Sequence, residues 1–357
     1  MNHPTDISNG SASEKRLSAT VLICTCNRAS HLAETLQSIA GTDARGISWD
    51  VLVVDNNSTD DTRAVVERAA AAYPVPLRYV LESRQGLCWA RNTGVAESTG
   101  EVVAITDDDV RVSSEWLHEF VDGLERYGCD YAAGRVVPIW ERDPPVWFPR
   151  SNGLLWGVVA ILDYGSEPKE LGRRVPLGVN MAVRRSAFWR VGEFDVRLGR
   201  TVGTLMGQAE REWCLRARAL GVVGYYLPAA VVHHHIPARR LTKRYFRQWF
   251  YWRGVSRAIL YARNGVDMER PEESRLNFRD VPHIGGVPRY MFRSAIHAAY
   301  AAVIARLRNQ PAESFERELW LWNFAGIIRQ RWAHRNVLPG SLGSSAPAAN
   351  DARTSPH

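Results

Sequence analysis

The sequence predicts an α/β fold in which a mostly parallel sheet is flanked by helices. Two observations predict it: short apolar runs alternate with helical patterns along residues 17–109, and polar clusters directly follow three of these runs. With 357 residues, 45% of them hydrophobic, the chain can bury the core of one large domain or two modest ones. Ligands of such sheets lie beyond the carboxyl ends of the strands, so the polar clusters predict a binding site there.

Each element of this first part follows from its own pattern. Buried strands are expected where apolar residues run together, at 21–24, 51–54, 77–81 and 101–106. Helices are expected where apolar residues recur every three or four positions, at 32–40, 63–72 and 87–95. The polar clusters that follow the strands are Thr25 to Arg28, Asp55 to Ser58 and Asp107 to Asp109.

The pattern is less regular from residue 110 to residue 237. Here we expect helices at 114–127 and 208–220, strands at 175–183 and 222–227, and a loop rich in Pro and Trp at 138–149. From Ala238 the chain turns basic, aromatic and helical, with later amphipathic helices at 291–307 and 315–328. The polar ends, 1–16 and 337–357, are expected to be disordered.

Composition restricts the partner and the compartment. A net charge of +7 and a pI of about 9.3 favour an anionic partner such as a phosphate, a membrane surface or a nucleic acid. The five cysteines lack the paired spacing of zinc sites, which favours reduced thiols in the cytoplasm. The chain starts without a secretory signal and has no stretch of ~20 apolar residues, so we expect it to lie on a membrane at most.

Three adjacent carboxylates end the fourth expected strand. Asp107, Asp108 and Asp109 repel one another, so their grouping at a strand end indicates a counter-cation. Oxygen ligands suit Mg²⁺ or Mn²⁺, and such an ion would in turn bind a diphosphate. The alternative is a solvated acidic turn, which the strand-end position disfavours.

Seven motifs resemble those of glycosyltransferase family 2, in the same order and at a similar spacing. They lie at 21–28, 53–60, 86–94, 105–109, 177–181, 191–195 and 210–216. The resemblance covers about residues 19–240 and implies a GT-A fold. It implies a catalytic domain at 17–237, with a nucleotide-binding half at 17–109 and an acceptor-binding, catalytic half at 110–237. A basic, aromatic helical extension at 238–336 follows. It also implies inversion at the transferred sugar.

The resemblance implies roles for particular residues. The positions of Asp107 and Asp109 hold the ribose and the metal on the donor diphosphate, and the position of Arg91 lies near the nucleotide. Cys26 stands where many members carry an aromatic residue that stacks on the base, so the base is left open. The other residues expected at the nucleotide-sugar are Cys24, Thr25, Asn27, Arg28, Asp55, Asn56 and Asp108.

Glu210 is the candidate catalytic base. Trp213, Ala217 and Leu220 follow it at i+3, i+7 and i+10, which places Glu210 on the inward face of its helix. A carboxylate there costs free energy unless it is paired or functional. The matching family position takes the proton from the acceptor hydroxyl. The alternative is a helix-start carboxylate favoured by the helix dipole, and Glu212 is expected to point elsewhere.

Two further features lie near the end of the expected catalytic domain. Three consecutive histidines follow the strand expected to end at Leu227, and the spacing from the flanking prolines matches His234 to a family position that completes the metal shell. Residues 238–263 then carry eight Lys or Arg, no acid, and interleaved aromatic residues. This segment suits an anionic membrane surface, or a solvated basic face whose aromatic residues pack on the catalytic domain. No nucleic-acid-binding module is visible.

Together with these residues, the resemblance implies a hexosyltransferase-type glycosyltransferase. It would move a sugar from a nucleoside-diphosphate sugar to a saccharide or lipid-linked acceptor with Mn²⁺ or Mg²⁺, in bacterial surface polysaccharide or glycoconjugate synthesis. We expect it in the cytoplasm, at the inner face of the cell membrane. One alternative is a sugar nucleotidyltransferase, disfavoured because 24–28 contains no glycine. The other is a non-catalytic nucleotide- or carbohydrate-binding protein, disfavoured by the intact carboxylates.

Overall fold

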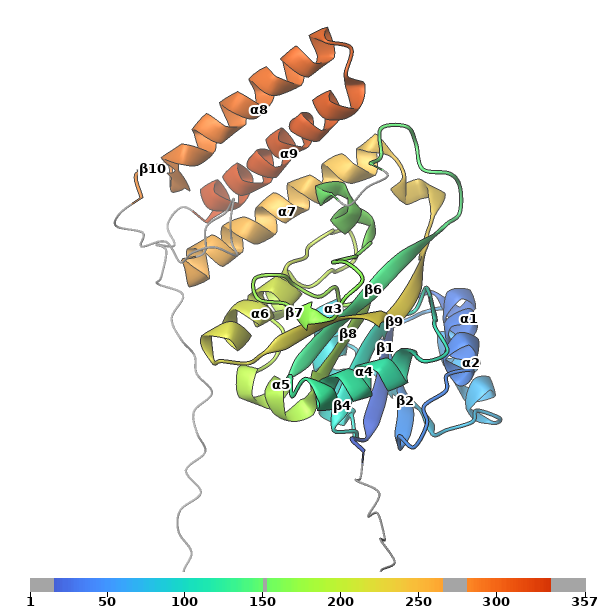
Figure 1. Ribbon diagram of the computed structural model, residues 1–357. Helices are drawn as coiled ribbons and strands as arrows, with labels where there is room; N and C mark the ends of the chain where they lie inside the picture. Colours follow the sequence, from blue (N-terminus) through green and yellow to red (C-terminus); the bar gives the residue numbers. More distant parts are fainter. Residues whose placement is uncertain (1–15, 150–152, 266–280, 335–357) are drawn as a thin grey trace, which may run out of the picture.

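The computed structural model describes residues 16–149, 153–265 and 281–334. The ends expected to be disordered, 1–16 and 337–357, lie outside these ranges except for Arg16. The described chain consists of a domain built around a sheet and a stack of three long helices beside it (Figure 1). The expected α/β fold with a C-terminal helical extension is therefore confirmed.

Nine strands of the described chain form one sheet. They are β1 (Ala19–Thr25), β2 (Trp49–Asp55), β3 (Leu77–Leu81), β4 (Val102–Asp107), β5 (Val110–Val112), β6 (Tyr131–Trp140), β7 (Lys169–Glu170), β8 (Asn180–Arg184) and β9 (Gly224–Ile236). Their order is β3-β2-β1-β4-β8-β6-β9-β5, and β7 pairs with β9. Because β1 to β4, β6 and β9 share one direction, the sheet is mostly parallel, as expected.

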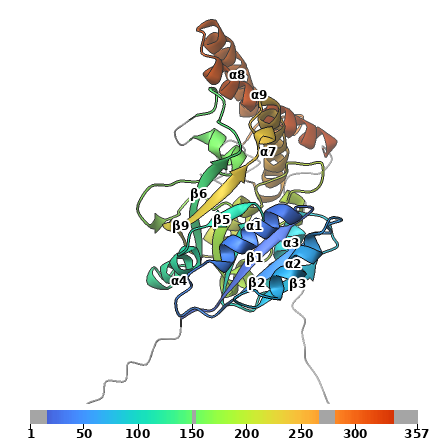
Figure 2. The ribbon, with the colours of Figure 1, turned by 90° about the vertical axis from the view of Figure 1, so that its right-hand side faces the viewer.

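Helices flank this sheet. β1, β2 and β4 are buried along almost their whole length, which is why their sequences are continuous apolar runs. The flanking helices are α1 (Ala29–Ala40), α2 (Thr62–Ala70), α3 (Leu87–Glu97), α4 (Trp116–Arg126), α5 (Arg185–Val191) and α6 (Ala209–Ala219). α3 packs on β1 and β2, and α4 packs on β6 and β9. Figure 2 shows α1, α2 and α3 beside β1 to β3, with the helical extension above them.

The second half of the sheet differs from the sequence-based expectation. The loop expected at 138–149 begins inside β6, and the strand expected at 222–227 continues as β9, so the three histidines lie within a strand. Pro228 does not end β9, because the register with β6 shifts between Gly134 and Arg135 and three residues of β9 bulge out there. A bulge of this kind leaves no periodic pattern in the sequence.

Asn180 at the start of β8 holds this bulge in place. Its side-chain amide donates to the carbonyl oxygens of Arg135 at 2.7 Å and Ala230 at 2.9 Å. Its side-chain oxygen accepts a hydrogen bond from the Trp116 indole at 2.8 Å. The strand expected at 175–183 is shorter than predicted, since β8 starts at Asn180. This residue ties β6, β9 and α4 together.

Three long helices form the extension: α7 (Lys243–Asn264), α8 (Arg289–Leu307) and α9 (Pro311–Ala333). α9 lies between α7 and α8 (Figure 1). α7 and α9 approach closely at Gly254 and Gly326, where a Cβ on either glycine would collide with a backbone oxygen of the other helix. Buried Phe246 and Phe250 of α7 pack in one cluster with Val159 and Ile236, which fixes α7 to the sheet domain.

Much of the positive charge of residues 238–263 faces protein. Arg253 and Arg257 are buried, and Arg247 forms an ion pair with Glu318 of α9 at 2.7 Å. Arg263 pairs with Asp195, and Arg240 turns toward the sheet. None of the helices in the described ranges is long and apolar enough to cross a membrane.

Candidate active site

A cavity of about 490 Å³ opens at the carboxyl ends of the parallel strands, where the polar clusters predict a binding site. It brings together residues from β1, β4, α3, α6, β9 and α7 and from the turn after β2, which are far apart in the sequence. The predicted site residues that line it are Cys24, Thr25, Cys26, Arg28, Asn56, Arg91, Asp107, Asp108, Asp109, Glu210 and His234.

Asp107, Asp109 and His234 direct possible metal-ligand atoms to one point. These atoms all lie within 4.8 Å of one another. Asp107 ends β4, whereas Asp109 reaches His234 because β5 pairs with β9. In that pair Val110 lies opposite His234, and the backbone N–H of His235 donates to the Asp109 carbonyl at 2.9 Å. The β9 extension that the sequence patterns do not predict therefore builds this cluster.

Two buried polar atoms in this cluster have no hydrogen-bond partner among the described residues. They are Asp109 Oδ1 and His234 Nδ1. His234 Nε2 lies 3.3 Å from Asp109 Oδ1. A buried carboxylate oxygen without a hydrogen bond is costly, and a divalent cation would offset that cost. Carboxylate oxygens with one imidazole nitrogen suit Mn²⁺ or Mg²⁺, so these residues fit a divalent metal.

Arg28 supplies positive charge to the carboxylates of Asp108 and Asp109. Its Nη1 donates to Asp108 Oδ1 at 2.9 Å and to Asp109 Oδ2 at 2.6 Å, and Thr25 donates to Asp108 Oδ2 at 2.7 Å. Burial raises the pKa of Asp108 above the usual carboxyl range, although Arg28 opposes the shift. For Asp109, burial is outweighed by His234 and Arg28, so its pKa is lowered. Asp109 is therefore the carboxylate of this pair whose charged form its surroundings favour.

Arg91 connects the cation cluster with the candidate base. Its buried guanidinium donates to Glu210 Oε1 at 2.6 Å and lies 3.5 Å from Asp107 Oδ1. Burial raises the pKa of Glu210, but the charge and hydrogen bond of Arg91 outweigh it and the net pKa is lowered. Glu210 stands in the first turn of α6 and lines the cavity. An ionised carboxylate in that position can accept a proton from a bound hydroxyl.

The family comparison agrees with this arrangement. Residues 20–192 match the family described as glycosyl transferase family 2. The chain carries a glycosyltransferase family 2 domain. The resemblance inferred from the motifs is confirmed, and this chain is a glycosyltransferase. The matched segment contains Arg91 and the three aspartates, and Glu210 and His234 follow it.

A protein named as a glycosyltransferase and one named for polysaccharide biosynthesis are related to this chain in sequence. A glucosyl-dolichyl phosphate glucuronosyltransferase of Haloferax volcanii is 26% identical over 248 residues, which cover 68% of this chain and 77% of that protein. The succinoglycan biosynthesis protein ExoM of Rhizobium meliloti is 28% identical over 232 residues, which cover 63% of this chain and 71% of that protein.

A solved structure shares the fold of this glycosyltransferase. The mannosyltransferase PcManGT of Pyrobaculum calidifontis, in complex with GDP-Man and Mn²⁺, superposes with a TM-score of 0.60 at 20% identity. The likeness covers 89% of this chain and 88% of that one. At this identity the likeness shows the fold, and the expected GT-A architecture is confirmed.

Asn27 and Asp55, expected at the nucleotide, do not line the cavity but support its loops. The Asn27 side-chain oxygen accepts from the Thr59 N–H at 2.7 Å. The Asp55 carboxylate accepts from the Ser58 N–H at 2.9 Å and from the Tyr79 hydroxyl at 2.8 Å. A direct contact of either residue with the nucleotide stays a prediction.

Other residues expected to contact the nucleotide also form hydrogen bonds or pack within the protein. The Asn56 amide donates to the Arg84 carbonyl and accepts from the Gly86 N–H, both at 2.7 Å. Burial raises the pKa of the Cys24 thiol to about 12, as expected for a packed, unreactive side chain. Cys26 is partly exposed at the cavity, which keeps it as the candidate contact for the base.

The sequence patterns do not indicate several residues that line the cavity. Arg240 and Trp249 belong to the basic, aromatic segment, but the pattern does not show which of its side chains face inward. Gln85 and Arg200 lie in loops without periodicity, so no sequence signal selects them.

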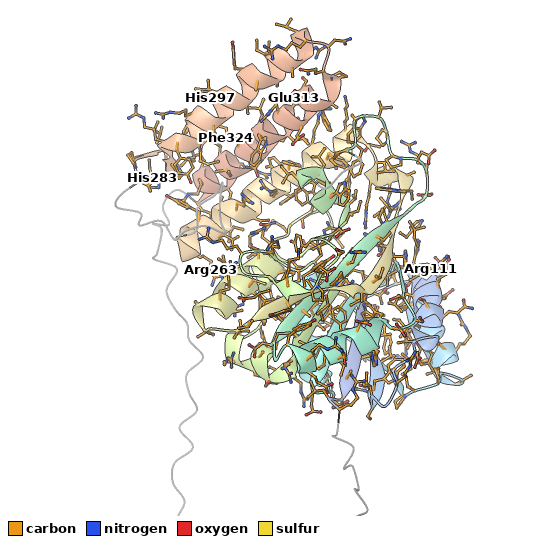
Figure 3. All side chains as sticks on the ribbon, in the orientation of Figure 1. Arg111, Arg263, His283, His297, Glu313 and Phe324 are labelled. Atoms are coloured by element: carbon orange, nitrogen blue, oxygen red, sulfur yellow. The ribbon has the colours of Figure 1, made fainter. Side chains whose placement is uncertain are left out.

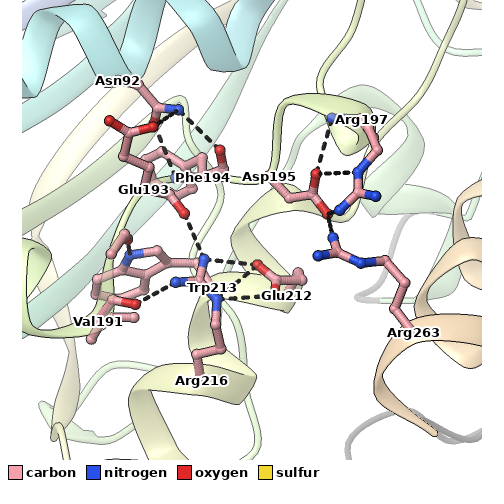
Figure 4. A network of polar contacts seen from close by, with 11 residues as sticks. Asn92, Val191, Glu193, Phe194, Asp195, Arg197, Glu212, Trp213, Arg216 and Arg263 are labelled. Carbon is pink, nitrogen blue, oxygen red and sulfur yellow. Dashed lines mark hydrogen bonds and ion pairs between the residues drawn. The ribbon is translucent and has the colours of Figure 1, made fainter. Parts of the chain in front are cut away.

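Glu212 has a structural role (Figure 4). Its carboxylate is 6% exposed and forms an ion pair with Arg216 at 2.8 Å. Arg216 also donates to the carbonyl oxygens of Val191 and Glu193, which ties α6 to the preceding loop. As predicted, Glu212 points away from the cavity that Glu210 lines.

We expect Glu212→Gln to lower the free energy of unfolding by about 1–3 kcal/mol, because it weakens charge-assisted hydrogen bonds at a buried site. The turnover of the folded fraction should stay near that of the wild type. Denaturant unfolding followed by tryptophan fluorescence measures the first quantity. Glu34→Gln, at a side chain that is 64% exposed, is the control and should change neither value. A stable Glu212→Gln variant without turnover would contradict this role.

Proposed function

We propose that this glycosyltransferase moves a sugar from a nucleoside-diphosphate sugar to an acceptor hydroxyl in one displacement that inverts the anomeric carbon. One observation carries the proposal: the Glu210 carboxylate and the cluster of Asp107, Asp109 and His234 line the same cavity. The carboxylate can take a proton, and the cluster can hold a cation against a leaving diphosphate.

Asp107, Asp109 and His234 would hold the metal, Mn²⁺ or Mg²⁺. When bound, the metal would neutralise charge on the departing diphosphate. Two observations support this assignment: the buried atoms of Asp109 and His234 that lack hydrogen bonds, and the Mn²⁺ in the solved mannosyltransferase of the same fold.

Arg28 and Arg240 provide positive charge beside Asp109 on one wall of the cavity, and Arg200 lies near Arg240 there. The side chain of Arg240 is only 11% exposed, and its contacts with Asp109 and His234 are long, at 3.9 and 3.5 Å. A buried cation with such long contacts favours an anionic ligand. We therefore assign the donor diphosphate to this wall.

Glu210 acts as the general base in this proposal. Arg91 holds one oxygen of the carboxylate and keeps the group ionised, so it can take the proton as the acceptor oxygen attacks. The same arginine approaches Asp107, which fixes the distance between the base and the donor side of the site.

The acceptor that we propose is a saccharide, free or carried on a lipid, in the synthesis of a bacterial polysaccharide or glycoconjugate. Two similarities support it: one to a protein named for succinoglycan biosynthesis, the other to an enzyme named for glucosyl-dolichyl phosphate. All five cysteines are free and four are buried, which supports a reaction in the reducing cytoplasm.

Product analysis with a panel of nucleotide-sugars, Mn²⁺ or Mg²⁺, and saccharide acceptors tests the proposal. Release of nucleoside diphosphate together with a glycosylated acceptor of inverted configuration is the expected result. Release of pyrophosphate would instead show a nucleotidyltransferase. Donor binding without any product would show a binding protein.

A further inference from the structure

The outer face of α8 carries a line of exposed apolar side chains. Ile296, Tyr300, Val303 and Leu307 are exposed by 69%, 68%, 56% and 78%. Their spacing of four, three and four residues places them on one side of the helix. On its inner side α8 packs on α9, whose Phe324 is labelled in Figure 3, and the Phe292 ring of α8 lies 5.1 Å from the Phe324 ring between ring centres. All four side chains of this outer line are more than half exposed.

Basic residues complete this face. Arg289 and Arg293 are exposed and continue the apolar line toward the start of the helix. Arg306 and Arg308 are exposed on either side of Leu307 at its end. The sequence of α8 contains no acidic residue. A face that combines large apolar and cationic side chains matches an anionic lipid surface, where the apolar groups enter the interface and the arginines meet phosphates.

Exposed apolar area is concentrated in this part of the molecule. Seven of the fourteen exposed large hydrophobic side chains of the described chain lie at 281–334, which is less than a fifth of it. Contiguous apolar patches on soluble proteins usually mark an interaction site. A second copy of the chain fits this face less well, because two identical faces would bring like-charged arginines together.

We propose that the outer face of α8, made of these four apolar and four basic side chains, docks this protein on an anionic lipid membrane. The inference goes beyond the proposed function, because docking requires neither donor nor metal. It places the membrane contact on α8, since much of the charge of α7 faces protein.

Flotation of the full chain with lipid vesicles tests the proposal. The protein should float with phosphatidylcholine vesicles that contain phosphatidylglycerol at low salt, and remain at the bottom with phosphatidylcholine alone or at high salt. The double variant Arg293→Glu, Arg306→Glu should lower partitioning by about 25-fold or more, because each basic residue near such a surface contributes roughly fivefold. The matched control is Arg63→Glu, Arg111→Glu, with side chains 71% and 64% exposed on the sheet domain. It changes the net charge equally and should float like the wild type.

The triple variant Ile296→Ser, Val303→Ser, Leu307→Ser tests the apolar part. It should lose flotation while its circular dichroism, thermal unfolding and donor hydrolysis stay like those of the wild type. Wild-type protein that fails to float with anionic vesicles would overturn the proposal. A control Arg63→Glu, Arg111→Glu that loses as much flotation as Arg293→Glu, Arg306→Glu would also overturn it. A wild-type dimer in sedimentation that the serine variant converts to a monomer would assign the face to self-association instead.

Discussion

Glu210→Gln is expected to lower kcat by roughly 10²–10⁴-fold while donor affinity stays close to that of the wild type. Glutamine keeps the size of the side chain and can still accept the hydrogen bond from Arg91, but it cannot take a proton from the acceptor. Steady-state kinetics with a saturating donor gives kcat, and calorimetric titration of the donor into each protein gives the affinity.

Glu193→Gln is the control, since Glu193 is exposed near the same helix but does not line the cavity. It should leave kcat unchanged. Glu212→Gln is unsuitable as a control because that carboxylate stabilises the fold. Normal turnover in Glu210→Gln, or equal losses of donor affinity and kcat, would contradict the assignment of the base.

The pH dependence of kcat should reflect the lowered pKa of Glu210. A carboxylate with a depressed pKa is ionised above that pKa, so activity is lost only as the pH falls through it, below the ordinary carboxyl value of 4.5. Arg91→Gln removes the charge that lowers the pKa of Glu210 and leaves burial, which raises it, as the main influence. The acid limb of the pH profile of kcat should therefore move to higher pH. Arg91→Lys keeps the charge and should keep the limb near its wild-type position. Identical limbs in all three proteins would contradict this account.

Asp109→Asn should weaken Mn²⁺ binding and lower kcat/KM by roughly 100-fold or more, because metal neutralisation of a leaving group contributes several kcal/mol. Asp109 is the buried carboxylate whose pKa is lowered, and it has an oxygen without a hydrogen bond. Asparagine retains the shape but not the charge. Calorimetric titration of Mn²⁺ without donor separates the loss of metal affinity from the loss of rate.

Asp61→Asn provides the matched control at an exposed aspartate and should bind Mn²⁺ like the wild type. Thermal unfolding of Asp109→Asn checks that the neighbouring Arg28 does not destabilise the fold once its partner loses charge. Unchanged Mn²⁺ affinity in Asp109→Asn, or full wild-type activity in excess chelator, would remove the metal from this cluster.

The nucleotide-binding half could be predicted in detail because its strands and helices are periodic. β3 matches its expected bounds, β1 and β2 are longer by two residues at the start and one at the end, and β4 is shifted by one residue. The adjacent carboxylates were informative for the same reason: Asp107 is the last residue of a buried strand, so its place at the sheet edge follows from the pattern. Helical spacing predicts that Glu210 faces inward, and Glu210 lines the cavity, although Leu220, expected on the same face, is 52% exposed.

The second half of the sheet could not be predicted, because its structure depends on tertiary contacts. β6 contains Pro138, and β9 passes through Pro228, residues that ordinarily indicate a strand end. The bulge held by Asn180 accommodates Pro228, and no local pattern indicates that. The approach of Arg240 to the carboxylates likewise depends on how the extension packs, which charge and composition do not specify.

The glycine contact between α7 and α9 has a consequence for which acceptors can be reached. Gly254 and Gly326 let the backbones of α7 and α9 touch, which holds these two helices in one arrangement at their crossing. If α8 rests on lipid as proposed, this arrangement would set the height of the cavity above the bilayer. An acceptor hydroxyl on a lipid-linked glycan would reach Glu210 only when its chain spans that height. Glycan length, as well as the chemistry of the terminal sugar, would then select the substrate.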